Sequence, residues 1–181
     1  MIYTFLAEGF EEIEALTPVD LLRRKGKEVI TVGVGGKNMT GRSGITVIAD
    51  TVIDEIVLND EVEMIFLPGG MPGTENLYSS VKVREAVSYC FNHNIFIAAI
   101  CAAPSILGRM GLLKNNVKAT CYPGFEKFLE GASISSDSVV RDGKIITAKG
   151  AGVSVKFALE LVRALCGDKE AESLGNSIIY E

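Results

Sequence analysis

The stretch Ile95-Phe96-Ile97-Ala98-Ala99-Ile100 is apolar throughout and is followed at once by Cys101-Ala102-Ala103-Pro104. A short, wholly apolar run of this kind is typical of a strand that is buried on both faces. The residues Ala103–Met110 then show a helical pattern. The chain therefore turns from a buried strand into a helix at Cys101, and the small residues that follow suit a tight turn.

The same alternation of strands and helices continues on both sides of this stretch. Further strands are predicted at Ile2–Ala7, Glu28–Val34, Ile45–Ala49, Met64–Leu67, Val139–Arg141 and Ile145–Ala148, the last two joined by a hairpin turn at Asp142-Gly143. Further helices are predicted at Glu11–Lys25, Lys82–Asn92 and Val153–Leu165. Such alternation indicates βαβ units. We therefore expect an α/β fold with a mostly parallel central sheet covered by helices on both sides.

Length and composition predict one globular domain over residues 1–181, with 48% apolar and 23% charged residues. The 18 Lys and Arg side chains against 23 Asp and Glu give a net charge of −5. No basic excess is available for a phosphate backbone, so we expect no nucleic-acid partner. No apolar run is long enough to span a membrane, and the first residues lack the basic start of a signal peptide. We expect a cytoplasmic protein that does not insert into membranes.

The chain has one histidine, His93, and four cysteines, at positions 90, 101, 121 and 166. The cysteine spacings contain no C-x-x-C pattern, so reduced thiols are expected rather than disulfides. One histidine excludes a His-rich metal site, and we expect no metal. His93 precedes the strand that Cys101 follows, so roughly 20 Å should separate them. A Cys–His pair within one subunit is therefore excluded.

The active sites of parallel α/β sheets lie beyond the carboxyl ends of the strands. Cys101 follows one strand there and resembles a nucleophile elbow, in which nearby backbone N–H groups stabilise an oxyanion. A helix starting after it would lower the pKa of the thiol. The alternative is an inert buried cysteine at a strand end. Gly69-Gly70, after Met64–Leu67, is either a plain turn or a place where the backbone closely approaches a ligand.

Three acidic residues, Glu11, Glu12 and Glu14, begin the first predicted helix. Acids in a first turn complement the helix dipole, which suffices to explain Glu11 and Glu12. Glu14 lies beside the apolar stripe, and Pro18 cannot donate a hydrogen bond to its carbonyl group. We therefore expect a break or kink near Pro18, which would aim Glu14 inward.

Four motifs resemble the ThiJ/PfpI family, the family of the Parkinson's-associated protein deglycase within the class I glutamine-amidotransferase-like superfamily. They occur in order along nearly the whole chain: Phe10-Glu11-Glu12-Ile13-Glu14-Ala15 with Pro18-Val19-Asp20, Leu67-Pro68-Gly69-Gly70, Ala98-Ala99-Ile100-Cys101-Ala102, and Lys149-Gly150-Ala151-Gly152. The resemblance implies a flavodoxin-like three-layer sandwich, usually a homodimer.

The resemblance also implies roles for individual residues. Cys101 matches the reactive nucleophile, and Glu14 matches the acid that hydrogen-bonds its sulfur. The backbone of Gly69, Gly70 and Ala102 matches the oxyanion-binding groups, and no cofactor is implied. A carboxyl group that keeps its proton can donate to a thiolate, so the two groups would titrate as a pair.

The sequence departs from the family pattern at two positions. Close relatives commonly carry a histidine before a proline near the cysteine, whereas this chain has Tyr122 there, before Pro123. A phenol is a poor general base at neutral pH, although it can donate a hydrogen bond. Ala103 stands where relatives often have glycine, which disfavours a positive φ at that position.

These residues support three functions. The first is a cofactor-free glyoxalase or deglycase, in which Cys101 adds to a 2-oxoaldehyde such as methylglyoxal, or to its adducts, and Glu14 moves a proton. The second is an oxidative-stress sensor or chaperone-like protein in which Cys101 oxidises to sulfinate, with Cys121 as a possible resolving thiol. The third is an amidase or protease, which would need a histidine beside Cys101 that the same chain does not supply. Charge near the site could come from Arg23, Arg24 and Arg42, including across a dimer.

Overall fold

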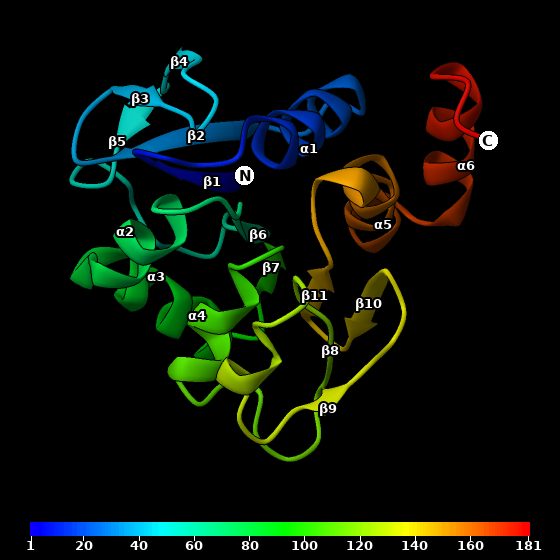
Figure 1. Ribbon diagram of the computed structural model, residues 1–181. Helices are drawn as coiled ribbons and strands as arrows, with labels where there is room; N and C mark the ends of the chain where they lie inside the picture. The colour runs from blue at the N-terminus through cyan, green and yellow to red at the C-terminus, as the bar shows by residue number, and fades with distance from the viewer.

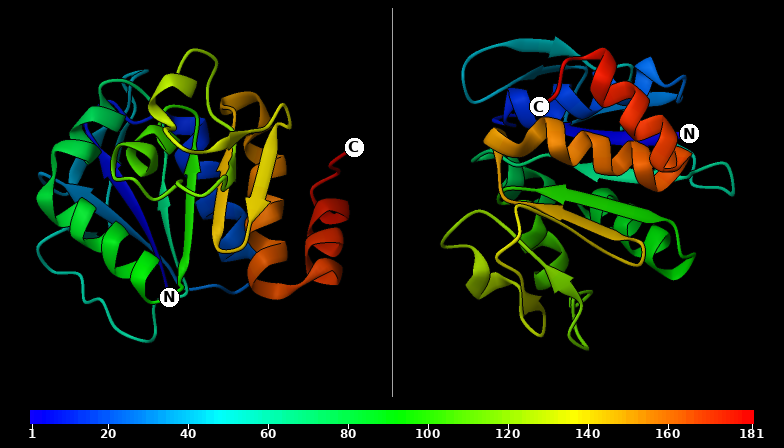
Figure 2. Two further views of the ribbon diagram at one scale, coloured as in Figure 1. Left: turned by 90° about the horizontal axis from the view of Figure 1, so that it is seen from below. Right: turned by 90° about the vertical axis from the view of Figure 1, so that its right-hand side faces the viewer.

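A computed structural model describes residues 1–181 of the protein as three layers (Figures 1 and 2). The middle layer is a seven-stranded sheet in the spatial order β10-β11-β7-β6-β1-β2-β5. Its strands, in chain order, are β1 (Ile2–Ala7), β2 (Val29–Val34), β5 (Thr51–Val52), β6 (Met64–Leu67), β7 (Phe96–Ile100), β10 (Val139–Asp142) and β11 (Ile145–Ala148). Every neighbouring pair is parallel except the β10–β11 hairpin. This confirms the expected mostly parallel α/β sandwich.

Helices cover both faces of this sheet (Figure 2). One face carries α1 (Glu12–Arg24) and α5 (Ser154–Cys166), with α6 (Asp168–Ser177) packed outside α5. The other face carries α2 (Gly73–Ser79), α3 (Val81–Asn92) and α4 (Pro104–Arg109). The helices α2 and α6 were not predicted from the sequence.

Alternate side chains of the central strands pack into two separate hydrophobic cores, one on each face of the sheet. In β7, Ile97 and Ala99 face the core under α3 and α4, whereas Phe96, Ala98 and Ile100 face the core under α1 and α5. Both sets are buried, which explains why this strand is apolar at every position. None of the helices is both long and apolar enough to cross a membrane.

The remaining short elements lie outside the central sheet. The strand predicted at Ile45–Ala49 is β4 (Thr46–Ile48), which pairs with β3 (Asn38–Thr40) in a separate hairpin. The strands β8 (Lys118–Ala119) and β9 (Ser133–Ile134) form another small sheet. Two 3-10 turns are η1 (Glu126–Phe128) and η2 (Ala151–Val153).

The predicted break at Pro18 is wrong, because α1 runs without interruption from Glu12 to Arg24 with Pro18 inside it. Proline removes one backbone N–H, and the buried contacts of this helix outweigh that loss. Glu14 nevertheless points inward, since its position on α1 faces the sheet edge and its side chain is 1% exposed.

Candidate active site

Cys101 lies at the point where β7 gives way to α4. Its N–H group donates to the carbonyl oxygen of Ala148 at 2.9 Å, and its own carbonyl accepts from the N–H of Tyr122 at 2.8 Å. Its φ is +64°, a left-handed conformation that is unfavourable for a residue with a side chain. Ala103 is helical, with φ of −63°. The strained backbone conformation of this turn is therefore that of Cys101 itself, as in a nucleophile elbow.

Glu14, in the first turn of α1, extends its side chain toward Cys101. Its Oε2 accepts a hydrogen bond from the N–H of Gly69 at 3.0 Å, and its side chain is hydrogen-bonded to that of Cys101. The N–H of Ala151, after β11, also bonds to this carboxyl group. A methyl group built on Gly150 would lie 3.7 Å from Glu14 Oε1 and 3.9 Å from Cys101 Sγ. Segments from four parts of the chain thus meet around one thiol and one carboxyl group.

The two glycines after β6 make this approach possible. A Cβ atom on Gly69 would lie 2.5 Å from Glu14 Oε2 and 2.6 Å from Cys101 Cβ, so no larger residue fits. Gly70 has φ of +92°, and its N–H bonds to the sulfur of Cys101 together with the N–H of Ala102. The family resemblance implies that the amides of Gly69, Gly70 and Ala102 all bind the oxyanion. In the structure the Gly69 amide donates to Glu14 instead, and the amides of Gly70 and Ala102 donate to Cys101.

Burial dominates the electrostatics of Glu14. Removal from water raises its pKa from 4.5 to about 7, and the charge of Glu11 adds to the rise. Hydrogen bonds from Cys101, Gly69 and Ala151 oppose the rise without cancelling it. The carboxyl group can therefore hold a proton close to neutral pH.

The thiol does not have the lowered pKa that its place before a helix predicts. Burial raises the pKa of Cys101, and the negative charge of Glu14 raises it further, against the amides of Ala102 and Gly70. The helix that follows has only six residues. The contribution from Glu14 requires an ionised carboxylate, so it vanishes while Glu14 keeps its proton. The two groups therefore titrate as a pair, and the first proton leaves the pair near neutral pH.

A cleft of about 530 Å³ opens over Cys101. Tyr122 lines it, 51% exposed, with its ring packed edge-on against Phe125. Arg42 lines the cleft as well. Tyr122 thus lies at the site, as expected, and Arg42 is the one arginine of the three candidates found there.

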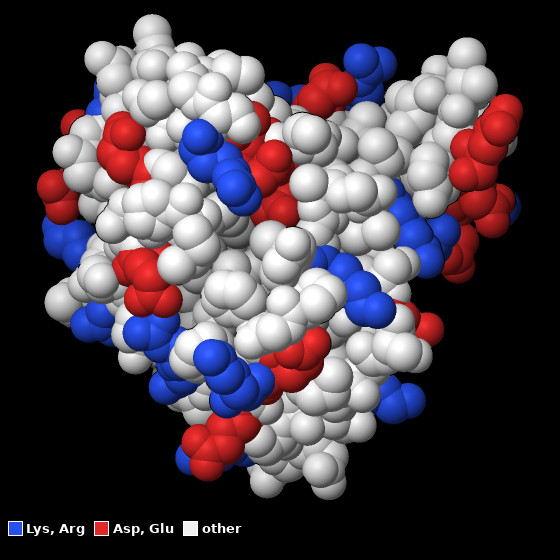
Figure 3. Space-filling view, viewed as in Figure 1, with Lys and Arg blue, Asp and Glu red and all other residues white.

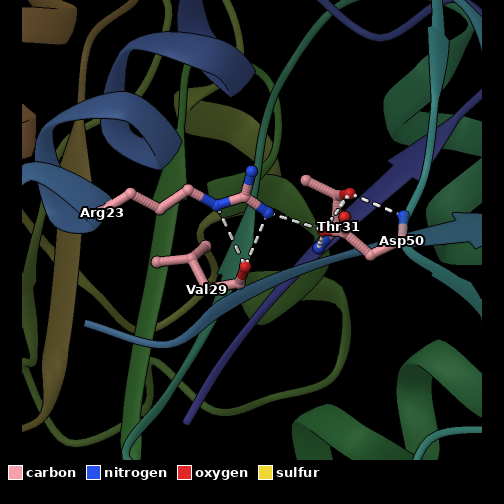
Figure 4. Close-up of polar contacts among 4 residues, drawn as sticks. All are labelled: Arg23, Val29, Thr31 and Asp50. Atoms are coloured by element: carbon pink, nitrogen blue, oxygen red, sulfur yellow. Dashed lines mark hydrogen bonds and ion pairs between the residues drawn. The ribbon is translucent and has the colours of Figure 1, made fainter. Parts of the chain in front are cut away.

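Arg23 and Arg24 lie away from the cleft of their own chain, and a contribution from either residue across a dimer stays a prediction. Arg23 is in the last turn of α1, where it donates to the carbonyl of Val29 and pairs with Asp50 (Figure 4). Val29 begins β2, so this network lies at the opposite end of the strands from Cys101. Arg24 pairs with Asp20 on the same helix.

The single histidine lies at the far end of β7, as predicted. His93 is exposed, caps the C-terminus of α3, and stacks on Tyr89 at a ring distance of 4.0 Å. All four cysteines are free. Cys121 is 3% exposed and lines a different cavity, beside Lys149. No three His, Cys, Asp or Glu side chains gather as a metal site would require.

The sequence missed two contributors to the site. Glu11 caps α1 by accepting from the N–H of Glu14 at 2.7 Å, and it also lines the cleft. Ala151 supplies an amide to Glu14. The motif Lys149-Gly150-Ala151-Gly152 was the available signal for the second, but spacing alone gave it no role.

Together, the fold and the site define an α/β sandwich with a cysteine on a nucleophile elbow, bonded to a buried carboxyl group. The chain belongs to the DJ-1/PfpI family, whose family model matches residues 1–164.

Three known proteins illustrate this membership. Protein DJ-1 homolog B of Arabidopsis thaliana is 35% identical over 179 residues, which cover 96% of this chain and 40% of that protein, so the chain spans less than half of that relative's length. Glutathione-independent glyoxalase DJR-1.2 of Caenorhabditis elegans is 32% identical over 169 residues, covering 92% and 89% of the two chains. The solved structure of Toxoplasma gondii DJ-1, oxidized, superposes with a TM-score of 0.93 at 31% identity, covering 99% of this chain and 97% of that chain.

Proposed function

We propose that the protein is a cofactor-free glyoxalase or deglycase-like enzyme that converts 2-oxoaldehydes such as methylglyoxal, free or as adducts, to 2-hydroxy acids. The observation that carries this proposal is the hydrogen-bonded pair of Cys101 and Glu14 at the base of an open cleft. The similarity to a relative named as a glutathione-independent glyoxalase supports the same reaction.

The reaction begins when the Cys101 thiolate adds to the aldehyde carbon of methylglyoxal and forms a C–S bond. The carbonyl oxygen becomes an oxyanion, which the amides of Gly70 and Ala102 stabilise and which takes the proton held by Glu14. The product of this step is a hemithioacetal, and Glu14 is left as a carboxylate.

Glu14 then acts as a base. It removes the proton from the former aldehyde carbon and returns it to the neighbouring carbon. The hydroxyl proton of the former aldehyde carbon passes to the oxygen of the neighbouring carbon, and the hemithioacetal thereby becomes a thioester of lactate. Water cleaves the thioester, releasing lactate and restoring the thiol. The sum is methylglyoxal plus water giving lactate, with no external oxidant or reductant.

This proposal needs only one copy of the chain, because every group named comes from the same subunit. Tyr122 lies at the cleft as a hydrogen-bond donor to the substrate rather than as a base. A working thiol of this kind suits a reducing compartment such as the cytoplasm.

The test is the release of lactate from methylglyoxal by the purified protein and by Cys101→Ser. The serine variant should lose at least about a hundredfold in kcat/KM, since a hydroxyl is a far weaker nucleophile. Cys166→Ser is the matched control, because Cys166 ends α5 away from the cleft. Full activity in Cys101→Ser would overturn the proposal.

A second candidate function is a redox sensor, favoured by the two amides that already bond to the Cys101 sulfur. Oxidation by a peroxide would place sulfinate oxygens beside these amides and beside a carboxyl group able to donate its proton. An amidase or protease is not supported, because no histidine reaches Cys101.

A further inference from the structure

Arg42 is the one basic side chain that lines the cleft over Cys101. It is exposed, and its guanidinium group makes no ion pair and no hydrogen bond within the chain. Every other arginine of the chain has such a partner. The planar, permanently charged guanidinium of Arg42 is therefore free to bind a ligand in the cleft.

The backbone under Arg42 is held firmly although its side chain is free. Its N–H group donates to the carbonyl of Phe10 at 2.8 Å, which ties the β3–β4 hairpin to the loop after β1. Glu12, which is 5% exposed, accepts from the N–H of Ser43 at 2.8 Å and from that of Ile45 at 3.4 Å. A Cβ atom on Gly41 would collide with the same carboxylate. A buried acid thus fixes the position from which Arg42 extends.

The other charged groups of the cleft do not neutralise Arg42. Glu14 holds its proton up to a pH of about 7 because burial raises its pKa. Glu11 is turned to the N-terminus of α1, where it accepts from the N–H of Glu14 and complements the positive end of the helix. Basic and acidic side chains are interspersed on the face in Figure 3, and the net charge of the chain is −5. Within one chain, Arg42 is therefore the group that attracts an anion to this cleft.

We propose that Arg42 selects 2-oxoaldehydes that carry a negative charge, a carboxylate or phosphate, on the end away from the aldehyde. This inference rests on the proposed function and narrows its substrate class. The aldehyde carbon meets Cys101, and the anionic tail pairs with the guanidinium at the rim. An example is 4,5-dioxopentanoate, which takes up one water and becomes 2-hydroxyglutarate by the same steps that give lactate. Its uncharged counterpart of equal length is 2-oxopentanal.

The kinetic test compares kcat/KM for these two compounds. In the wild-type protein the charged compound should be preferred about tenfold, since hydrogen bonds to charged groups are worth more than neutral ones. Arg42→Gln should remove this preference, and Arg42→Lys should keep part of it. Arg141→Gln is the matched control, because Arg141 is an exposed residue of β10 that does not line the cleft. An unchanged preference in Arg42→Gln would overturn the inference.

A second test does not depend on turnover. Iodoacetate and iodoacetamide alkylate the same thiol and differ chiefly in charge. The ratio of their rates at Cys101 should fall about threefold in Arg42→Gln and stay constant in Arg141→Gln. Added salt should reduce the ratio in the wild-type protein. A protein that alkylates in this way but makes no hydroxy acid would refute the proposed function while retaining the anion site, and an unchanged ratio would refute the anion site by itself.

Discussion

The side chain of Glu14, from the first turns of α1, is hydrogen-bonded to the thiol of Cys101, which directly follows β7. The amide of Gly69 bonds to the carboxyl group, and the amides of Gly70 and Ala102 bond to the sulfur. Each partner therefore has its own backbone hydrogen-bond donors, and the two groups are coupled when they titrate. This arrangement gives a cysteine an acid–base partner in a chain whose only histidine is at the other end of the sheet.

The raised pKa of Glu14 predicts a pH dependence of stability. Below pH 4.5 this carboxyl is protonated in the folded and unfolded states alike. Between 4.5 and about 7 the unfolded state ionises while the folded state keeps its proton, so the folded state loses stability as the pH rises. The loss reaches at most about 3 kcal/mol above pH 7.

Urea unfolding of the wild type and of Glu14→Gln from pH 4 to pH 8 measures this effect. The glutamine variant lacks the titration, so the free energy of unfolding of the wild type should fall relative to that of the variant across this range. A difference that stays constant with pH would show that Glu14 titrates normally in the folded protein.

Gly69→Ala should damage both the site and the fold. The added methyl group would lie 2.5 Å from Glu14 Oε2 and 2.6 Å from Cys101 Cβ, which forces the pair apart. We expect a loss of about 1 to 3 kcal/mol in stability and at least about a hundredfold in kcat/KM. Thermal unfolding and lactate release measure the two effects. Gly152→Ala is the control, since a Cβ there meets nothing within 4 Å; equal behaviour of the two variants would contradict the packing argument.

Tyr122 occupies the position at which the family resemblance leads us to expect a histidine. Tyr122→His should raise turnover of methylglyoxal about tenfold near pH 7, because an imidazole can exchange protons there and a phenol cannot. Tyr122→Phe should cost less than about threefold, since the phenol makes no hydrogen bond within the chain and serves at most as one donor to the substrate. A hundredfold loss in Tyr122→Phe would instead make the phenol essential to the reaction.

Mild peroxide should oxidise Cys101 first. The buried Cys90 and Cys121 are shielded, and the amides of Gly70 and Ala102 at the sulfur of Cys101 stabilise its oxidised form. Peptide mass spectrometry should find two added oxygen atoms on Cys101 before any on the other three residues. Glu14→Gln should slow this oxidation if the carboxyl holds the product by donating a proton. Equal oxidation of all four cysteines would remove the sensor hypothesis.

Much of the fold could be predicted because buried strands have a simple pattern. The runs Ile2–Ala7 and Met64–Leu67 are apolar at every position, and the structure gives both strands the predicted bounds. The helix α6 was not predicted because its buried residues are only Ala171, Leu174 and Gly175, too few for an apolar period to show. The edge strand β5 has only two residues, too short for any period to show.

The positions of the site residues could be predicted from the sequence, whereas their pKa values could not. The place of Cys101 after a parallel strand and the closeness of Gly69 follow from topology. The pKa of the thiol does not, because burial and a neighbouring acid outweigh a short helix, and neither burial nor that distance can be read from spacing. Burial also explains the wrong prediction at Pro18. The local sequence predicts a break there, but the buried contacts of α1 keep the helix continuous.

The rate of alkylation of Cys101 by iodoacetamide as a function of pH tests the shared proton most directly. In the wild type the rate should rise with a midpoint near pH 7, where the pair loses its first proton. In Glu14→Gln the midpoint should move above the ordinary value of a thiol, about 8.5, because burial then acts on Cys101 alone. The same midpoint in both proteins would contradict the account, since Cys101 would then titrate without Glu14.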